Sequence, residues 1–271
     1  MFMADGMPDI PLVTRQDAAG IATLTLNRPA ARNSLSRAVI ATLRATLASI
    51  ADDPAQRVIL LTAEGPAFCA GHDLREITAH RADADAGAAF FAATMAECAA
   101  LMQAIAQHRL PVIAVVEGVA TAAGCQMVAS CDLAIAGTNA RFSTPGVDIG
   151  LFCSTPAVAL SRSVARKPAM EMLLTGGMID AAEARRIALV NRVVPAGGAL
   201  AEASALAAAI AGRSALAVQL GKRAFNAQAN APLDEAYRLA SAAMVENLLA
   251  ADAAEGIGAF LEKRQPRWQD R

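Results

Sequence analysis

The chain has 271 residues, a net charge of −1 at pH 7 and a pI near 6.3. Without an excess of Lys and Arg it cannot neutralise a run of phosphates, which argues against nucleic acid as a partner. Residues 1–9 lack a basic region followed by an apolar stretch, and no apolar run approaches the roughly 18 residues that cross a bilayer. We therefore expect a cytoplasmic protein that does not bind a membrane.

The first part of the chain has the pattern of strands that alternate with helices. Residues 21–26 alternate as a half-buried strand does, and Pro29 ends that strand. Apolar residues at helical spacing from Ile40 to Ile50, with Ser36 as N-cap, predict a helix that leads into a buried strand at 58–62. These three elements form a strand-helix-strand unit.

Further along, the apolar spacing predicts a long helix over about residues 86–108. An apolar strand at 111–116, typical of one covered on both faces, and a short strand at 131–136 follow. The last part looks helical throughout, with breaks at Gly212, Pro232 and Gly256. The order predicts an α/β protein with a mainly parallel sheet, divided into a core of residues 10–197 and a helical subdomain of residues 198–271.

The cysteines follow no metal-binding pattern. Their number is odd, and they show neither the CxxC nor the paired Cys/His spacing of zinc sites; they are Cys69, Cys98, Cys125, Cys131 and Cys153. We expect reduced, mostly buried thiols and no metal.

Two glycine-containing loops each follow a buried strand and lead into a helix. They are residues 64–75 (EGPAFCAGHDLR) and residues 117–126 (EGVATAAGCQ). The first N–H groups of a helix have no partner inside the helix, so each loop is suited to hold an anion. Either loop alone is a weak signal.

Together and in this order, the two loops resemble the crotonase (enoyl-CoA hydratase/isomerase) superfamily. The resemblance continues through NRPAARNSL at 27–35, SCDLA at 130–134, LTGGMIDAAEA at 174–184 and AFLEKR at 259–264, so it covers essentially the whole chain. It implies a ββα spiral core with a C-terminal helical oligomerisation subdomain, and a homotrimer or dimer of trimers. It also implies an acyl-CoA or enoyl-CoA thioester as ligand, with coenzyme A as part of the substrate and no separate cofactor.

Three further strings narrow the resemblance to one subgroup. GHDL at 71–74, ATAAGCQ at 120–126 and TPGVDIGLFCSTP at 144–156 look most similar to the subgroup named enoyl-CoA hydratase domain-containing protein 3. The reaction of that subgroup does not follow from these strings.

The resemblance gives individual residues a role. The backbone N–H groups of His72 and Ala123 match the two donors that hold the thioester carbonyl, and one such donor typically contributes a rate factor of about a hundred to a thousand. Helical backbone angles would accommodate Ala122 and Ala123, where the family usually has glycine. Residues matching the CoA contacts are Ala30, Ala31, Arg32, Asp73, Leu74 and Arg75, with Phe260 and Lys263 reaching the nucleotide phosphate from a neighbouring subunit. Arg75 and Lys263 are equally well explained as solvated surface charges.

The pattern departs from the family at both glutamates used for hydration. One position holds Gln126, which cannot titrate, and the other holds Gly146, which has no acid to offer. Asp148 would share the face of Gly146 if that segment is extended. Other candidate proton carriers or nucleophiles are Cys153, Ser154 and His72. Each also has an ordinary explanation, as a buried inert thiol, a hydroxyl without a base and a scaffold imidazole respectively.

Two hypotheses follow from this pattern. The first is an enzyme that polarises the thioester and performs enolate-type chemistry, such as isomerisation or weak hydration, with an unusual proton carrier. The second is a non-catalytic acyl-CoA-binding protein that retains the pocket without acid/base chemistry.

Overall fold

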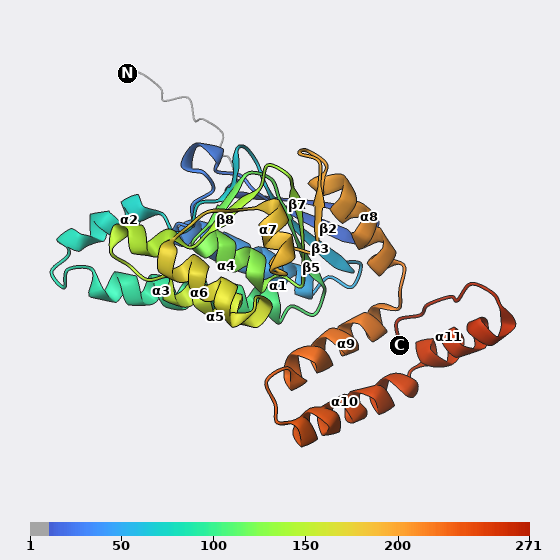
Figure 1. The fold of residues 1–271 in the computed structure, drawn as a ribbon. Coiled ribbons are helices and arrows are strands. Elements are labelled where there is room, and N and C mark those ends of the chain that lie inside the picture. Colours follow the sequence, from blue (N-terminus) through green and yellow to red (C-terminus); the bar gives the residue numbers. More distant parts are fainter. Residues whose placement is uncertain (1–10) are drawn as a thin grey trace, which may run out of the picture.

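The structure is a computed structural model that describes residues 11–271, in which two sheets are surrounded by helices (Figure 1). The expected start of the core at residue 10 and the pattern noted in residues 1–9 lie outside this range. The larger sheet contains, in spatial order, β1 (Val13–Ala18), β2 (Ile21–Leu26), β3 (Val58–Ala63), β5 (Val112–Val116), β7 (Leu133–Gly137) and β10 (Arg192–Val194). The smaller sheet contains β4 (Ala67–Cys69), β6 (Val119–Thr121), β8 (Arg141–Ser143) and β9 (Ile179–Asp180).

Strands β1 and β2 form an antiparallel hairpin, whereas the other pairs of the larger sheet are parallel. The hairpin turn consists of Ala19 and Gly20, both with positive φ (51° and 77°), as a two-residue turn between twisted strands requires. The sequence did not indicate β1, because its second half is polar and exposed.

Three times in succession a strand of the larger sheet is followed by a strand of the smaller sheet and then by a helix. The units are β3-β4 with α2 (Leu74–Ala79), β5-β6 with α4 (Ala123–Ser130), and β7-β8 with α5 (Ser154–Ser163). This repeated ββα order confirms the predicted α/β spiral core. The same order places the loop after each short strand on the same side of the smaller sheet, because β4, β6 and β8 are parallel.

Helices cover both faces of the larger sheet. Ile59 and Leu61 of β3 belong to the main core, which includes residues of α1 (Arg37–Ala51) and α3 (Ala88–Ala106). Val58 and Leu60, which alternate with them along β3, pack on the opposite face in a cluster with α8 (Ala199–Ala211). This alternation explains why the parallel strands read as continuous apolar runs. The division of the chain between residues 197 and 198 stays a prediction.

Helix α3 corresponds to the predicted long helix, and α1 begins as predicted, with Ser36 accepting a hydrogen bond from the Val39 N–H at 3.3 Å. Among the described residues α3 is long and apolar enough to span a membrane, and α8 with α9 (Ala215–Gln228) would pass if this pair, bent by 104°, were one span. The expectation that no segment reaches this length is therefore wrong. However, a core helix passes the same test, and α3 contributes Cys98 and Leu101 to the main core.

Three helices extend from the body as an arm (Figure 1): α9 (Ala215–Gln228), α10 (Leu233–Leu248) and α11 (Ala251–Glu262). The breaks at Gly212 and Pro232 are confirmed, because these residues cap α8 and α10. The break at Gly256 is wrong, since this residue lies inside α11. A Cβ atom there would lie 3.1 Å from the Trp268 ring, so glycine leaves room for the C-terminal segment to pack on the helix.

Candidate functional site

The two glycine-containing loops meet at Gly71 and Ala122. Gly71 has a φ of +89°, and a Cβ atom placed on it would lie 2.8 Å from Cβ of Ala122 and 3.4 Å from the backbone nitrogen of Ala123. The loops are neighbours because the strands that precede them, β4 and β6, pair in parallel. A side chain at position 71 would push them apart, so glycine is needed both for its φ and for the close approach.

The N–H groups of His72 and Ala123 lie on these adjacent loops. His72 is fixed by a bridge to Leu35, in which the Leu35 N–H donates to the Gly71 carbonyl at 2.8 Å and the Asp73 N–H donates to the Leu35 carbonyl at 3.1 Å. Ala123 is the first residue of α4, where N–H groups have no partner within the helix. Within residues 11–271, neither N–H has a hydrogen-bond acceptor. The corner therefore presents two free main-chain donors.

Ala122 adopts a conformation that the sequence did not suggest. Its φ of 50° and ψ of −118° lie outside the helical region, so the expectation of helical angles is correct for Ala123 and wrong for Ala122. Its N–H donates to the Ser143 carbonyl at 2.9 Å, which continues the β6-β8 pairing by one residue and holds the backbone in this turn.

Three buried polar side chains belong to the elements that adjoin Ala122, which are α4 and the end of β8. Gln126 lies one helical turn beyond Ala122, to whose carbonyl its N–H donates at 3.0 Å. Its Oε1 and the hydroxyls of Ser143 and Thr144 are buried and have no hydrogen-bond partner in the described part of the chain. No sequence pattern pointed to a role for Ser143 and Thr144, although both stand shortly before Gly146.

The imidazole of His72 is largely buried beside the first loop. Burial lowers the pKa of His72 below its usual value, so the ring is neutral at pH 7. Its Nε2 is buried and makes no hydrogen bond to any described residue. The ring is thus a neutral group with an unused nitrogen next to a free main-chain donor.

Gly146 and Cys153 are in contact. A Cβ atom on Gly146 would lie 2.9 Å from Sγ of Cys153, which is 8% exposed. Burial raises the pKa of the Cys153 thiol, and the Gly146 backbone opposes this shift. Burial also raises the pKa of Cys69 and Cys125, to about 12 each. All five cysteines are free and four are buried, as expected from the sequence.

Asp148 and Ser154 do not point at Gly146. Residues Pro145–Ile149 form a 3-10 turn, so the extended backbone that would have placed Asp148 on the face of Gly146 is absent. Asp148 is exposed, and its carboxylate lies about 3.0 Å from where a Cβ atom of Gly176 would be. Ser154 is also exposed, with its hydroxyl directed to the Phe152 carbonyl at 3.4 Å.

The two loop segments expected to contact CoA lie side by side. Ala30 and Ala31 belong to a 3-10 turn, Arg32 follows with a φ of 50°, and Asp73, Leu74 and Arg75 begin α2. The Ala70 N–H donates to the Arg32 carbonyl at 3.0 Å, which joins the segments. Leu74 and Arg75 are exposed.

Asp73 and Asn33 organise these segments. The Asp73 carboxylate accepts hydrogen bonds from the first N–H groups of α2 and pairs with Arg28 at 3.2 Å. Burial alone would raise the pKa of Asp73, but the hydrogen bonds from Arg28 and the α2 backbone outweigh burial, so this pKa is lowered. Asn33 is buried with a φ of 53°, and its amide donates to the carbonyls of Glu64 and Ala67 at 2.8 Å. No sequence pattern pointed to a role for Asn33, although asparagine is among the few residues that tolerate a positive φ.

Phe260 and Lys263 are not near these segments within one chain. They lie at the end of α11, in the arm, and α2 lies at the opposite end of the molecule (Figure 1). Phe260 is 81% exposed.

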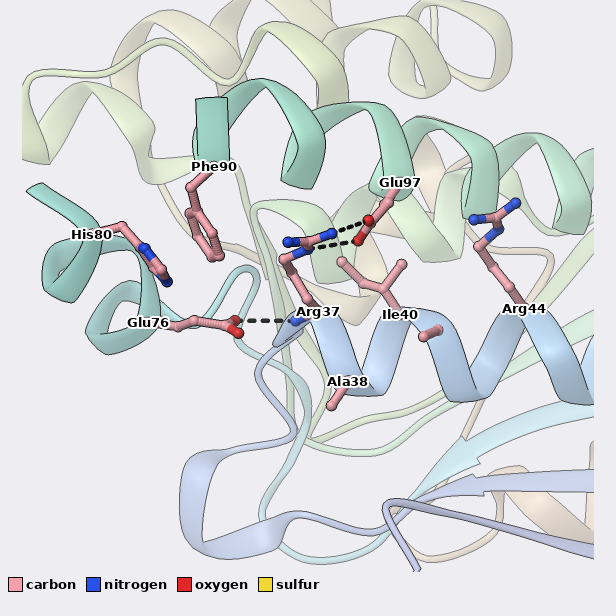
Figure 2. Close-up of a pocket in the computed structure, with 9 residues that line it drawn as sticks. Arg37, Ala38, Ile40, Arg44, Glu76, His80, Phe90 and Glu97 are labelled. Atoms are coloured by element: carbon pink, nitrogen blue, oxygen red, sulfur yellow. Dashed lines mark hydrogen bonds and ion pairs between the residues drawn. The ribbon is translucent and has the colours of Figure 1, made fainter. Parts of the chain in front are cut away.

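A separate groove of about 490 Å³ lies between α1, α2 and α3, and its polar side chains are largely paired with one another (Figure 2). Glu97 binds the Arg37 guanidinium, Glu76 accepts the Arg37 N–H at 3.0 Å, and the rings of His80 and Phe90 stack with centroids 3.6 Å apart. None of the residues predicted from the sequence lines this groove.

Comparison with known proteins identifies the family. The model of the enoyl-CoA hydratase/isomerase family matches residues 16–271. The chain belongs to this family. Proteins of the enoyl-CoA hydratase/isomerase family act on acyl-CoA thioesters and are commonly oligomeric.

Similar proteins of this family include the subgroup suggested by the sequence. Rat "enoyl-CoA hydratase domain-containing protein 3, mitochondrial" is 46% identical over 96% of this chain and 85% of its own length. The crystal structure of human enoyl coenzyme A hydratase domain-containing protein 3 is 45% identical, with a TM-score of 0.91 over 95% of this chain and 100% of that one. An enoyl-CoA hydratase structure from Mycobacterium smegmatis gives 45% identity and a TM-score of 0.90 over 95% and 99%.

The rat relative contradicts the cytoplasmic location expected from the sequence, because it is named as mitochondrial. The expectation was wrong for a physical reason. An apolar leader directs a protein to export, so its absence does not distinguish the cytoplasm from the mitochondrion. Mitochondrial transit peptides are amphipathic and rich in Arg.

Proposed function

We propose that this protein binds the thioester carbonyl of an acyl-CoA between the N–H groups of His72 and Ala123 and stabilises the enolate that forms from it. The observation that carries this proposal is the pair of free main-chain donors on adjacent loops. Such donors are fixed before the ligand arrives, so they stabilise developing negative charge on the oxygen without reorganisation. Coenzyme A would enter as part of the substrate, along Ala30, Ala31 and Arg32.

The chemistry at the α-carbon differs from that of a glutamate-dependent hydratase, since Gln126 and Gly146 stand where the family has two glutamates. Of the candidate proton carriers, His72 has the most suitable state, because its ring is neutral and its Nε2 is unpaired. In the proposed step Nε2 takes a proton from the α-carbon while the electron pair of that C–H bond moves toward the carbonyl oxygen. The product is an imidazolium and an enolate held by the two N–H groups.

A second candidate function is non-catalytic acyl-CoA binding. Two observations favour it: burial raises the pKa of the Cys153 thiol, which disfavours the thiolate that could accept a proton, and Asp148 is exposed on the outer side of its turn, away from Gly146. Either function is compatible with self-association through the arm. Within one chain Phe260 and Lys263 lie far from the expected CoA segments, so they would contact the CoA nucleotide only in a neighbouring copy.

Hydrogen exchange at the α-carbon of butyryl-CoA in D₂O, followed by NMR, separates the two functions. We expect exchange that His72→Asn slows by about a hundredfold, while the matched control His80→Asn leaves it unchanged. Calorimetry should show butyryl-CoA binding more tightly, by about tenfold, than its thioether analogue, which lacks the carbonyl. Equal affinities would refute the donor site, whereas selective binding without exchange would favour the non-catalytic function.

A further inference from the structure

Gly146 occupies a space in which a side chain would be crowded. It is buried, and its φ lies outside the left-handed range, so backbone freedom does not explain the glycine. A Cβ atom there would lie 2.9 Å from Sγ of Cys153, 3.1 Å from the Cys153 nitrogen and 3.1 Å from the Leu151 carbonyl oxygen. The first distance is shorter than real Cβ contacts, so something must move before any larger residue fits.

The surrounding segment has little freedom to move. The Leu151 N–H donates to the Gly146 carbonyl at 2.9 Å, and the Cys153 carbonyl accepts the Ala157 N–H of α5 at 2.9 Å. Cys153 precedes the first residue of α5 and is itself buried. Two of the three crowding atoms belong to the backbone, so Sγ is the one that a substitution can remove.

We propose that Cys153 is a specificity-determining residue, whose thiol fills the space beside position 146 and excludes the carboxylate that hydration requires there. This inference rests on the thioester site proposed above. The other hydratase position is Gln126, which is 4% exposed and whose Oε1 has no partner among the described residues. The reacting carbon would thus lie between a neutral amide and a neutral thiol. Consequently, restoring the two glutamates does not restore hydration unless the thiol is removed as well.

A stability cycle tests the packing without any need for activity. Gly146→Ala is introduced into the wild-type protein, into Cys153→Ala and into Cys98→Ala, and the fall in Tm is measured in each background. Cys98 is a matched control, because it is a buried cysteine whose Sγ is not among the atoms nearest to Gly146. The fall in the Cys153→Ala background should be less than half of that in the other two. Equal falls in all three would overturn the proposal.

Hydration of crotonyl-CoA tests the functional consequence. The double variant Gln126→Glu with Gly146→Glu should be nearly inactive, and adding Cys153→Ala should raise its rate by at least about a hundredfold, which is the size of one general acid or base contribution. A double variant as active as the triple, or a folded, ligand-binding triple variant that is no faster than the double, would refute the role of Cys153. Failure of the wild-type protein to bind butyryl-CoA would instead refute the thioester site, and the stability cycle would still decide the packing.

Discussion

Ala122 holds its backbone at φ 50° and ψ −118°, a region that glycine occupies freely and alanine does not. A residue with a Cβ atom in such a region typically costs about 1–3 kcal/mol, and the surrounding structure must hold it there. The hydrogen bond to Ser143 and the start of α4 provide that restraint. The strain lies beside one of the two free donors, so the geometry of the donor corner is maintained at a cost in stability.

Ala122→Gly is therefore expected to raise the free energy of unfolding by about 1 kcal/mol, because relief of the strain exceeds the roughly 0.4–1 kcal/mol entropic cost of glycine. Ala123→Gly is the matched control, since its residue already has helical angles and glycine there costs up to about 1 kcal/mol. Urea unfolding at one fixed protein concentration measures both. A loss of stability in Ala122→Gly as large as that in Ala123→Gly would contradict the strain.

At the scale of elements, one carboxylate joins the arm to the large sheet. Lys222 of α9 donates to Asp132 Oδ2 at 2.6 Å and to the Leu110 carbonyl at 3.0 Å, and Asp132 also accepts the Val112 N–H at 2.7 Å. The Lys222 side chain is 9% exposed. Burial raises the pKa of Asp132, while the Lys222 ammonium opposes this shift. The pair thus fixes α9 where β5 and β7 begin.

Lys222→Met should lower the free energy of unfolding by about 1.5–3 kcal/mol, because it removes two hydrogen bonds of a buried ammonium and leaves the partly buried Asp132 carboxylate without its charged partner. The exposed Lys167 of α6 (Arg166–Thr175) supplies the control, and Lys167→Met is expected to change stability by less than about 0.5 kcal/mol. Chemical unfolding of the two variants side by side provides the measurement. Similar effects of both substitutions would show that the Lys222–Asp132 pair does not stabilise the protein.

At the scale of the whole molecule, the arm exposes an apolar surface that no other part of residues 11–271 covers. None of the residues of α10 is buried, and the exposed apolar side chains of the arm include Leu233, Tyr237, Met244, Leu249, Phe260 and Leu261. Large exposed apolar patches mark sites of association. Proteins of this family are commonly oligomeric, so a second copy of the chain is the partner that we expect on this surface, and the trimer or dimer of trimers stays a prediction.

Light scattering after gel filtration should accordingly give a mass that is a multiple of 27.8 kDa, with three or six copies expected. Leu249, 82% exposed, is the test position: Leu249→Glu should lower the mass toward one copy. Leu200→Glu on α8, an exposed leucine outside the arm, should leave the mass unchanged. A wild-type protein that elutes as a single copy would refute self-association through the arm.

The sequence by itself determined the family, the alternation of the main strands with helices and the residue types at the candidate site. Apolar runs predicted β2, β3, β5 and β7, because a strand covered on both faces has no polar positions. The resemblance of the two glycine-containing loops to the family assigned the donor role to His72 and Ala123, and that role stays a prediction. The strand predictions succeed because each depends on a local pattern of side chains.

Only the tertiary structure decided how the site is filled. Ala122 takes its unusual angles from a hydrogen bond to β8, Asp148 turns outward because residues 145–149 coil into a 3-10 turn, and Cys153 meets Gly146 through a bend between them. Asn33 likewise gains its role from carbonyl groups some thirty residues away. Such contacts join segments whose spacing along the chain carries no pattern, so their geometry follows from packing.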